Sequence, residues 1–344
     1  MSKPIKSYSL QEVKELMEKA GLAKFRAKQV IDWVYAKRAL SYDEMTNLPK
    51  AMREQLQREY PLFTPRVVVK QESIDGTRKY LLEYHDGTMV ETVGLPSRDG
   101  RLTACVSSQS GCAMACSFCA TGKAGLCRSL DPGEIVDQVF AVQDDFEKKV
   151  TNVVVMGQGE PFSNYEATLD ALRIMNNPRL LNIGARHITV STCGIIAGIE
   201  RFAEEPEQFT LAVSLHAARQ QVRDLLMPGV KNQRLGALRQ ALSHYVDATG
   251  RRFTIEYALM KGVNDGSEDL EALTTFCRRL LCHVNIIPLN KVEDSPYQPV
   301  SRAVMNEWQA HLEQSGTPAT VRLSKGPDIS AACGQLRSDI LATS

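Results

Sequence analysis

The chain has 344 residues, of which 43% are hydrophobic and 24% charged, and its formal net charge at pH 7 is +1. This composition is typical of a globular protein, and no apolar run approaches the roughly 20 residues that a membrane-spanning helix requires. The sequence therefore excludes an integral membrane protein. The near-zero net charge gives no global sign of a nucleic-acid partner. Because the first residues lack the apolar core of a secretory signal, we expect a cytoplasmic protein.

The nine cysteines form an odd and unevenly spaced set in a long chain. Such a set argues against a structural disulfide framework and favours reduced thiols or metal ligands. Four of the cysteines are expected to be small buried apolar residues: Cys127, Cys193, Cys277 and Cys282.

Residues 1–60 are predicted to form a small helical domain. Apolar residues recur there at helical spacing, as in Val13, Leu16 and Met17. Five basic residues decorate the stretch: Lys24, Arg26, Lys28, Lys37 and Arg38. They are consistent with a solvated helix face and also with a surface that touches RNA.

Residues 61–98 are predicted to form an extension built on a β-hairpin. Two β-rich runs, 79–84 and 88–93, flank an Asp-Gly pair at Asp86 and Gly87. Asp-Gly between two such runs is a strong signal for a tight hairpin turn.

Residues 99–344 alternate short Val/Ile/Thr-rich runs with helical segments. The expected strands are 102–108, 150–156, 187–192, 209–215, 253–260, 283–288 and 319–324. This alternation predicts an α/β fold with a parallel sheet, curled into a full or partial (β/α) barrel. One helix start is explicit, because Asp131 offers an N-cap, Pro132 a first helical residue and Glu134 an acid in the first turn.

Polar motifs follow several of these strands at the point where each strand ends. Cys112 follows the first strand, the segment 157–161 the second, Ser191 the third, Ser214 the fourth and Asn290 the sixth. Because α/β barrels build their sites at the carboxyl ends of parallel strands, we expect these residues to share one site.

Three cysteines, Cys112, Cys116 and Cys119, are spaced C-x3-C-x2-C on the loop after the first strand. Three thiolates suit a [4Fe–4S] cluster with one iron left open, which could chelate S-adenosylmethionine. The competing metal is zinc, which would need a fourth ligand such as Cys105 or Cys127.

The cysteine loop and the Gly-Gln-Gly-Glu-Pro segment 157–161 resemble the radical S-adenosylmethionine (SAM) superfamily. Segments 105–112 and 328–336 resemble more specifically the RlmN/Cfr family of RNA adenine methyltransferases, and segments 25–29 and 47–50 extend the likeness to the helical start. The resemblance implies a radical SAM barrel with an RNA-binding accessory domain at its N-terminus.

The resemblance also implies site residues. The implied cofactor contacts are Gly159, Glu160, Ser191, Ser214, Leu215, His216 and Asn290. Glu91 is implied as a general base. Taken singly, these serines and the histidine are more often ordinary hydrogen-bonding residues, and a lone hairpin glutamate is usually solvated. Their shared location favours a site.

Cys105 and Cys333 fit no cluster spacing, but closure of the barrel could bring them together. The resemblance implies that Cys333 takes a methyl group from one SAM molecule as a thiolate nucleophile. A radical generated from a second SAM then activates this methyl group, which joins carbon 2 of adenine. Cys105 resolves the RNA adduct, leaving a Cys105–Cys333 disulfide that must be reduced.

The implied product is 2-methyladenosine in 23S ribosomal RNA, at the peptidyl-transferase centre, with an anticodon-loop adenosine of tRNA as a second substrate. The implied partners include an electron donor and a disulfide reductant. The nearest alternative is Cfr-type methylation at carbon 8, although the segment 287–290 is closer to the RlmN pattern. A small-molecule radical SAM enzyme would leave Cys105 and Cys333 without a role, and an RNA-binding module would not need Glu160. One departure is Gln158, where we expect methionine in most relatives.

Overall fold

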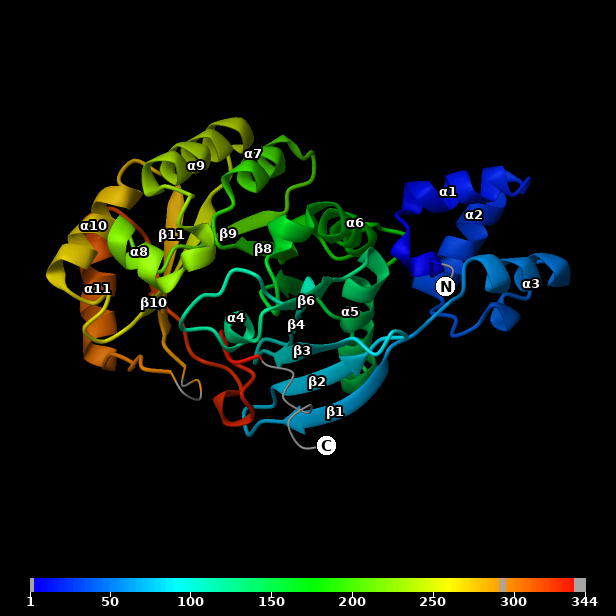
Figure 1. Ribbon diagram of the computed structural model, residues 1–344, viewed down its shortest axis with the longest axis horizontal. Helices are drawn as coiled ribbons and strands as arrows, with labels where there is room; N and C mark the ends of the chain where they lie inside the picture. The colour runs from blue at the N-terminus through cyan, green and yellow to red at the C-terminus, as the bar shows by residue number, and fades with distance from the viewer. Residues whose placement is uncertain (1–2, 291, 293–294, 337–344) are drawn as a thin grey trace.

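The computed structural model describes residues 3–290, 292 and 295–336. These residues form a ten-stranded sheet flanked by helices, together with a separate two-stranded sheet (Figure 1). In spatial order the large sheet comprises β1 (Arg66–Glu72), β2 (Arg78–Glu83), β3 (Met89–Pro96), β4 (Leu102–Cys105), β7 (Asn152–Val155), β8 (Ile188–Thr192), β9 (Thr210–Ser214), β10 (Phe253–Leu259), β11 (Cys282–Pro288) and β12 (Ala319–Val321).

The sheet has an antiparallel and a parallel part. Strands β1 to β4 pair antiparallel, whereas every pair from β4 to β12 is parallel. Among the described residues β1 and β12 are edge strands, so the predicted barrel is a partial one. Fully buried strand residues such as Val153, Val190 and Leu211 form its core.

Each of the seven predicted parallel runs contains an observed strand, and the predicted hairpin is β2–β3. Sequence analysis missed β1 and the small antiparallel sheet of β5 (Gln109–Gly111) and β6 (Leu126–Ser129). β1 and β6 are largely exposed, and β5 is buried but polar, so none of them shows the apolar pattern of a core strand. Cys127 lies exposed in β6, so its predicted burial is wrong, whereas the other three cysteines of that group are buried.

Helices cover the parallel strands. They are α4 (Ala120–Ala124), α5 (Pro132–Phe146), α6 (Tyr165–Asn176), α7 (Ile196–Glu204), α8 (Gln220–Leu226), α9 (Leu235–Thr249), α10 (Ser267–Cys277) and α11 (Arg302–Gln314), with 3₁₀ turns η4 (Pro161–Asn164), η5 (Ala185–His187), η6 (Pro228–Val230) and η7 (Pro327–Ile329). The predicted start of α5 is confirmed, because the Asp131 N–H donates to Glu134 Oε2 at 2.9 Å in a capping box. None of the described helices could span a membrane.

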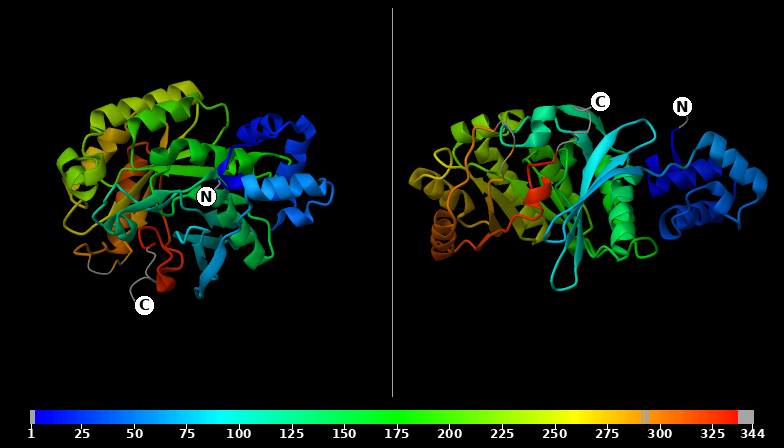
Figure 2. Two further views of the ribbon diagram at one scale, coloured as in Figure 1. Left: turned by 45° about the vertical axis from the view of Figure 1, so that its right-hand side comes forward. Right: turned by 90° about the horizontal axis from the view of Figure 1, so that it is seen from below.

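The N-terminal segment is helical and lies at one end of the molecule, beside α5 and α6 (Figures 1 and 2). It contains η1 (Ile5–Ser7), α1 (Leu10–Lys19), α2 (Lys24–Ile31), a π-helical turn η2 (Asp32–Ala36), η3 (Tyr42–Glu44) and α3 (Lys50–Glu59). Lys6 Nζ lies 2.6 Å from Asp137 Oδ1 of α5, and both side chains are buried. This ion pair anchors the N-terminal helices to the barrel.

Replacing Lys6 with methionine should leave the Asp137 carboxylate buried without its cation. Because breaking a buried ion pair from one side costs about 3–5 kcal/mol, we expect a loss of that order in the free energy of unfolding in urea. Lys50→Met is the control, since Lys50 and Glu54 form an exposed pair at 3.9 Å. Such a surface pair contributes about 0–1 kcal/mol to the free energy of unfolding, so Lys50→Met should change it little. Equal losses in the two variants would contradict the anchoring role.

Candidate active site

A cavity of about 240 Å³ lies at the carboxyl ends of the parallel strands. Its walls bring together most of the residues that the sequence marked. These are Cys105, Cys112, Cys116, Cys119, Gly159, Glu160, Ser191, Ser214, His216, Asn290 and Cys333. Glu91 and Leu215 are the two predicted site residues that do not line it. The prediction that the residues at the carboxyl ends of the parallel strands lie together is confirmed.

The three motif cysteines lie on the loop between β5 and α4. Its ends are fixed by two backbone hydrogen bonds, from Cys112 N–H to Gly125 O at 2.8 Å and from Cys119 N–H to Cys116 O at 3.1 Å. Burial raises the pKa of Cys112 to about 11, so in the metal-free protein it is a neutral thiol. Within the described residues no three His, Cys, Asp or Glu side chains converge on one metal-ion position. Three thiols on one short loop fit an iron–sulfur cluster, whereas a structural zinc ion would need a fourth protein ligand.

The segment α8–η6 (residues 220–230) backs this loop. The Ser117 N–H donates to Leu226 O at 2.9 Å, and the Gly229 N–H donates to Met114 O at 3.0 Å. A Cβ atom at Gly229 would lie 2.5–2.8 Å from the Met114 backbone. The absence of a side chain at Gly229 therefore allows η6 to hold the cysteine loop in place.

Glu160 supplies a buried carboxylate to the cavity. Its Oε1 accepts from Phe162 N–H at 2.9 Å and its Oε2 from Cys193 N–H at 2.7 Å. Burial raises the pKa of Glu160, while these hydrogen bonds oppose the rise. Gly159 precedes it with φ of 100°, and a Cβ there would lie 2.6 Å from Gln109 Cβ. A carboxylate fixed in this way suits an ammonium group such as that of SAM.

The polar strand ends of β8 and β9 meet on one cavity wall. The hydroxyl oxygens of Ser191 and Ser214 lie 3.4 Å apart, and both residues line the cavity. Leu215 is fully buried and packs in the core, so its side chain does not face the cavity.

His216 is a neutral hydrogen-bond donor to the cavity. Burial lowers the pKa of His216 to about 3. Its Nδ1 accepts from the Ala258 N–H at 3.0 Å, which leaves the proton on Nε2. Its ring packs edge-on against Phe118 of the cysteine loop, with ring centroids 4.8 Å apart.

The C-terminal segment brings Cys333 to the cavity. The N–H of Ala120, the first residue of α4, donates to Gly334 O at 2.8 Å, and Asn290 Nδ2 donates to Cys333 O at 3.1 Å. Cys333 is solvent-exposed at this position, and Cys105 lines the same cavity from the end of β4. Burial raises the pKa of Cys105 to about 12. The nearby Cys333 thiol is the second cause of this rise in the pKa. The predicted meeting of the two cysteines is confirmed.

The turn between β1 and β2 also anchors the C-terminal segment. Ser73 Oγ donates to Asp328 Oδ1 at 2.6 Å, and the Gly326 N–H donates to Asp75 Oδ2 at 3.2 Å. Lys79 Nζ on β2 also donates to Ser330 O at 3.4 Å. The C-terminal segment therefore lies across the open side of the barrel, as the red ribbon in Figure 1 shows.

Glu91 lies on β3 beside the cavity. It shares a face of β3 with Val93, whose partner across the sheet is Cys105. Its carboxylate is buried and lies 2.9 Å from Lys79 Nζ. Gln158, also buried, accepts the Glu91 N–H at 3.4 Å through its side chain and does not line the cavity. The alternative to a site residue, a solvated hairpin glutamate, does not apply to Glu91.

Among the charged cavity residues that the sequence analysis missed are Glu256 of β10 and Arg322 after β12. Their side chains lie 3.7 Å apart, and Asn285 Nδ2 donates to Glu256 Oε1 at 2.9 Å. Glu256 Oε2 is buried and has no hydrogen-bond partner in the described residues. No motif marks these residues. The only available signal was the charged Glu256 in the middle of the apolar run that forms β10.

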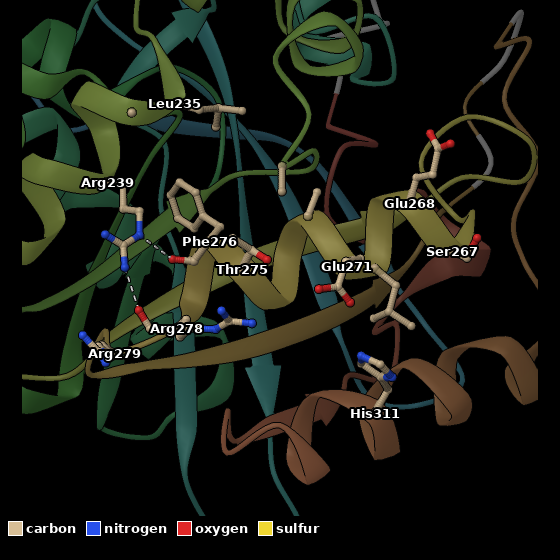
Figure 3. A pocket seen from close by; sticks show the side chains of 14 residues that line it. Leu235, Arg239, Ser267, Glu268, Glu271, Thr275, Phe276, Arg278, Arg279 and His311 are labelled. Atoms are coloured by element: carbon tan, nitrogen blue, oxygen red, sulfur yellow. Dashed lines mark hydrogen bonds between the residues drawn. The ribbon is translucent and has the colours of Figure 1, made fainter.

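A second hollow lies on the outer face, between α9, α10 and α11 (Figure 3). Arg239 crosses it and donates to Phe276 O at 3.0 Å and to Arg278 O at 2.6 Å. None of the predicted site residues lines this hollow. Arg239 caps the last carbonyl groups of α10, which is a structural role.

Two family models match the chain. One, described as the radical SAM superfamily, matches residues 106–276, and the other, the ribosomal RNA large subunit methyltransferase N-terminal domain, matches residues 5–61. A probable dual-specificity RNA methyltransferase RlmN from Geobacillus kaustophilus is 47% identical over 97% of this chain and 92% of its own length. The chain belongs to the RlmN family.

Two further proteins support membership of the RlmN family. A protein of the same description from Clostridium novyi is 41% identical over 98% of this chain and 99% of its own length. The crystal structure of a radical SAM methyltransferase from Sphaerobacter thermophilus is 45% identical, with a TM-score of 0.91, and covers 97% of this chain and 99% of its own. These matches confirm the predicted fold, family and enzyme class. The cofactors of this RlmN-family enzyme are a [4Fe–4S] cluster and SAM.

Substituting Gly229 by alanine should weaken cofactor retention, because the new Cβ would push the Met114 backbone and the cysteine loop aside. Overpacking of this kind costs about 1–3 kcal/mol, so we expect a lower melting temperature and less iron per chain after reconstitution. Gly236→Ala is the control, since a Cβ at Gly236 meets nothing within 4 Å. An iron content that matches the control would contradict the role of η6.

Proposed function

We propose that this protein methylates carbon 2 of adenine in 23S ribosomal RNA, at the peptidyl-transferase centre, and of an anticodon-loop adenosine in tRNA. The support is that RlmN-family relatives are named dual-specificity RNA methyltransferases. The single observation that carries the proposal is one cavity that holds the cysteine loop, Cys105 and Cys333 together. A small-molecule enzyme would not need the last two. The Cfr-type product, methylation at carbon 8, is not favoured because the relatives are of the RlmN type.

In this proposal Cys112, Cys116 and Cys119 hold the cluster. The remaining cofactor contacts are Gly159, Glu160, Ser191, Ser214, Leu215, His216 and Asn290. When bound, the cluster and SAM supply methyl transfer and a carbon radical, with two SAM molecules consumed per turnover. The fixed Glu160 carboxylate orients the cofactor ammonium group, and the neutral His216 offers an N–H donor. Leu215, whose side chain is buried, contributes through its backbone.

Cys333 is the methyl carrier, and its exposed position at the mouth of the cavity suits contact with an RNA base. The S-methyl group would lose a hydrogen atom to the SAM-derived radical, and its carbon would bond to carbon 2 of adenine. Loss of the carbon 2 proton, and of one electron that the cluster would take up, leaves the Cys333 sulfur joined to the base through the former methyl carbon. Attack by the Cys105 thiolate on the Cys333 sulfur then forms a disulfide and breaks the sulfur–carbon bond. The electron pair of that bond stays on the methyl carbon, which takes up a proton. An external reductant returns two electrons to restore both thiols.

Glu91 is the proposed general base that removes the carbon 2 proton. Its ion pair with Lys79 favours the carboxylate form that a base requires. Glu91 lies beside the cavity and not on its wall. A small movement of β3 or of the C-terminal segment therefore has to bring its carboxylate to the adenine ring. Lys79 touches both elements, through Glu91 and through Ser330.

Residues 1–60 are the proposed RNA-binding domain, residues 61–98 an extension and residues 99–344 the catalytic barrel. Of the basic residues that the sequence marked, Arg38 pairs with Asp144 and Lys37 lies 3.7 Å over the Trp33 ring. Lys28 is exposed, and so is Phe25, whose ring centroid lies 4.7 Å from Arg26 Cζ; a cation beside an aromatic ring suits an unpaired RNA strand. The further partners are a cellular electron donor and a disulfide reductant, and the proposed place of action is the cytoplasm.

Nucleoside mass spectrometry tests the product. RNA incubated with reconstituted enzyme, SAM and a reductant should contain 2-methyladenosine, at one site in 23S ribosomal RNA and one in tRNA. Cys116→Ala is the control, and it should abolish both iron binding and the product, since two thiolates cannot hold the cluster. Recovery of 8-methyladenosine would contradict the proposed position of methylation.

Cys105→Ala should separate methyl loading from release. The variant should still methylate Cys333 and attack adenine, but without a resolving thiol it should stop after one RNA is joined to the protein. A nuclease-sensitive shift on a denaturing gel, mapped to Cys333 by peptide mass spectrometry, would report this. The Cys105→Ala/Cys333→Ala double variant should show no shift. A folded, iron-loaded Cys105→Ala enzyme without trapped RNA would refute the assigned roles.

A further inference from the structure

Arg223 of α8 is the largest side chain in the described residues that is fully buried. Its Nη2 donates to Cys193 O at 2.6 Å, whereas Nε and Nη1 have no hydrogen-bond partner in the described part of the chain. No carboxylate forms an ion pair with it there. Its neighbour in sequence, Asp224, pairs instead with Arg234 at 3.7 Å. A buried charge without a counter-charge is costly, so this guanidinium requires an explanation.

The surroundings of Arg223 indicate where the missing negative charge belongs. Cys193, Leu226 and Met227 form an apolar cluster against which Cys116 packs. Arg223 therefore lies behind the wall that carries a cluster-ligating cysteine. The Arg223 guanidinium is hydrogen-bonded to the Cys193 carbonyl, and Cys193 belongs to the cluster that Cys116 packs against. Arg223 itself does not line the cavity, so it does not face the cofactor directly.

The same arginine also fixes Cys193, the residue whose N–H holds Glu160. The Cys193 N–H donates to Glu160 Oε2 at 2.7 Å, while the Cys193 carbonyl accepts from Arg223. Gly194 leaves room for the guanidinium, because a Cβ there would lie 3.0 Å from Nη2. One residue, Cys193, thus links the buried cation to the carboxylate on the cavity wall.

We propose that Arg223 is a positioning residue that compensates the negative charge of the iron–sulfur cluster and stabilises its reduced form. The inference rests on the proposed cluster ligands. A cluster with three thiolate ligands is anionic and gains one further negative charge when an electron donor reduces it. A desolvated cation behind Cys116 favours the more negative state, and net charge near a cluster is one of the factors that set its potential.

The test is an EPR-monitored redox titration of the reconstituted enzyme with dithionite as electron donor. Arg223→Gln keeps a polar N–H but removes the charge, and Arg223→Lys keeps the charge. At a fixed potential we expect a roughly tenfold lower ratio of reduced to oxidised cluster in Arg223→Gln, about 59 mV for one electron. Arg223→Lys should stay near wild type. Arg251→Met, which removes a clamp on Glu207 O and Phe209 O at the opposite end of the strands, should leave the potential unchanged.

Equal potentials in iron-loaded wild type and Arg223→Gln would overturn the inference, as would equal lowering in the glutamine and lysine variants. If Arg223→Gln loses iron, the free energies of unfolding of the metal-free proteins in urea distinguish a charge-compensating arginine from a purely structural one. The uncompensated cation makes metal-free Arg223→Gln at least as stable as metal-free wild type, and a marked loss of stability would show a purely structural arginine. A wild-type protein that binds no iron would contradict the proposed cluster site as well, whereas the other outcomes bear on Arg223 alone.

Discussion

The site depends on two hydrogen bonds between segments that are far apart in the sequence. The Ala120 N–H donates to Gly334 O at 2.8 Å, and Thr121 Oγ1 donates to Leu336 O at 2.7 Å. They attach the C-terminal segment to the helix that follows the cysteine loop, and so place Cys333 above the cofactor cavity. Because the barrel is open between β1 and β12, pairing of strands alone would not bring this segment across.

Three charged groups are buried on or behind the wall of the cavity. Glu160 and Glu256 are carboxylates buried on its wall, and Arg223 is a buried cation behind it. Arg223 costs stability in the metal-free protein, since it has no counter-charge in the described residues and burial of an unpaired charge is unfavourable. The η6 turn and the anchored C-terminal segment supply the rigidity that holds these groups in place. Cofactor binding should therefore stabilise the fold as well as enable the chemistry.

Much of the fold and part of the site could be predicted from the sequence. The parallel strands and the residues at their ends follow from local patterns, since each apolar run is short and its polar motif adjoins it. Glu256, Arg322 and Arg223 could not be found in this way, because their roles depend on which strands and helices become neighbours. Cys127 was placed wrongly for a related reason: its strand pairs only with another short polar strand, β5.

The central claim is that this fold selects one cysteine, out of nine, to carry a methyl group to RNA. Peptide mass spectrometry of the purified enzyme after incubation with SAM, in the absence of RNA, tests it most directly. The account predicts S-methylation of Cys333 alone, because only this thiol is exposed at the mouth of the cavity while anchored to the cysteine loop. Methylation of Cys105 or of an outlying thiol such as Cys127, or a fully unmethylated Cys333 in a cofactor-loaded enzyme, would contradict the account.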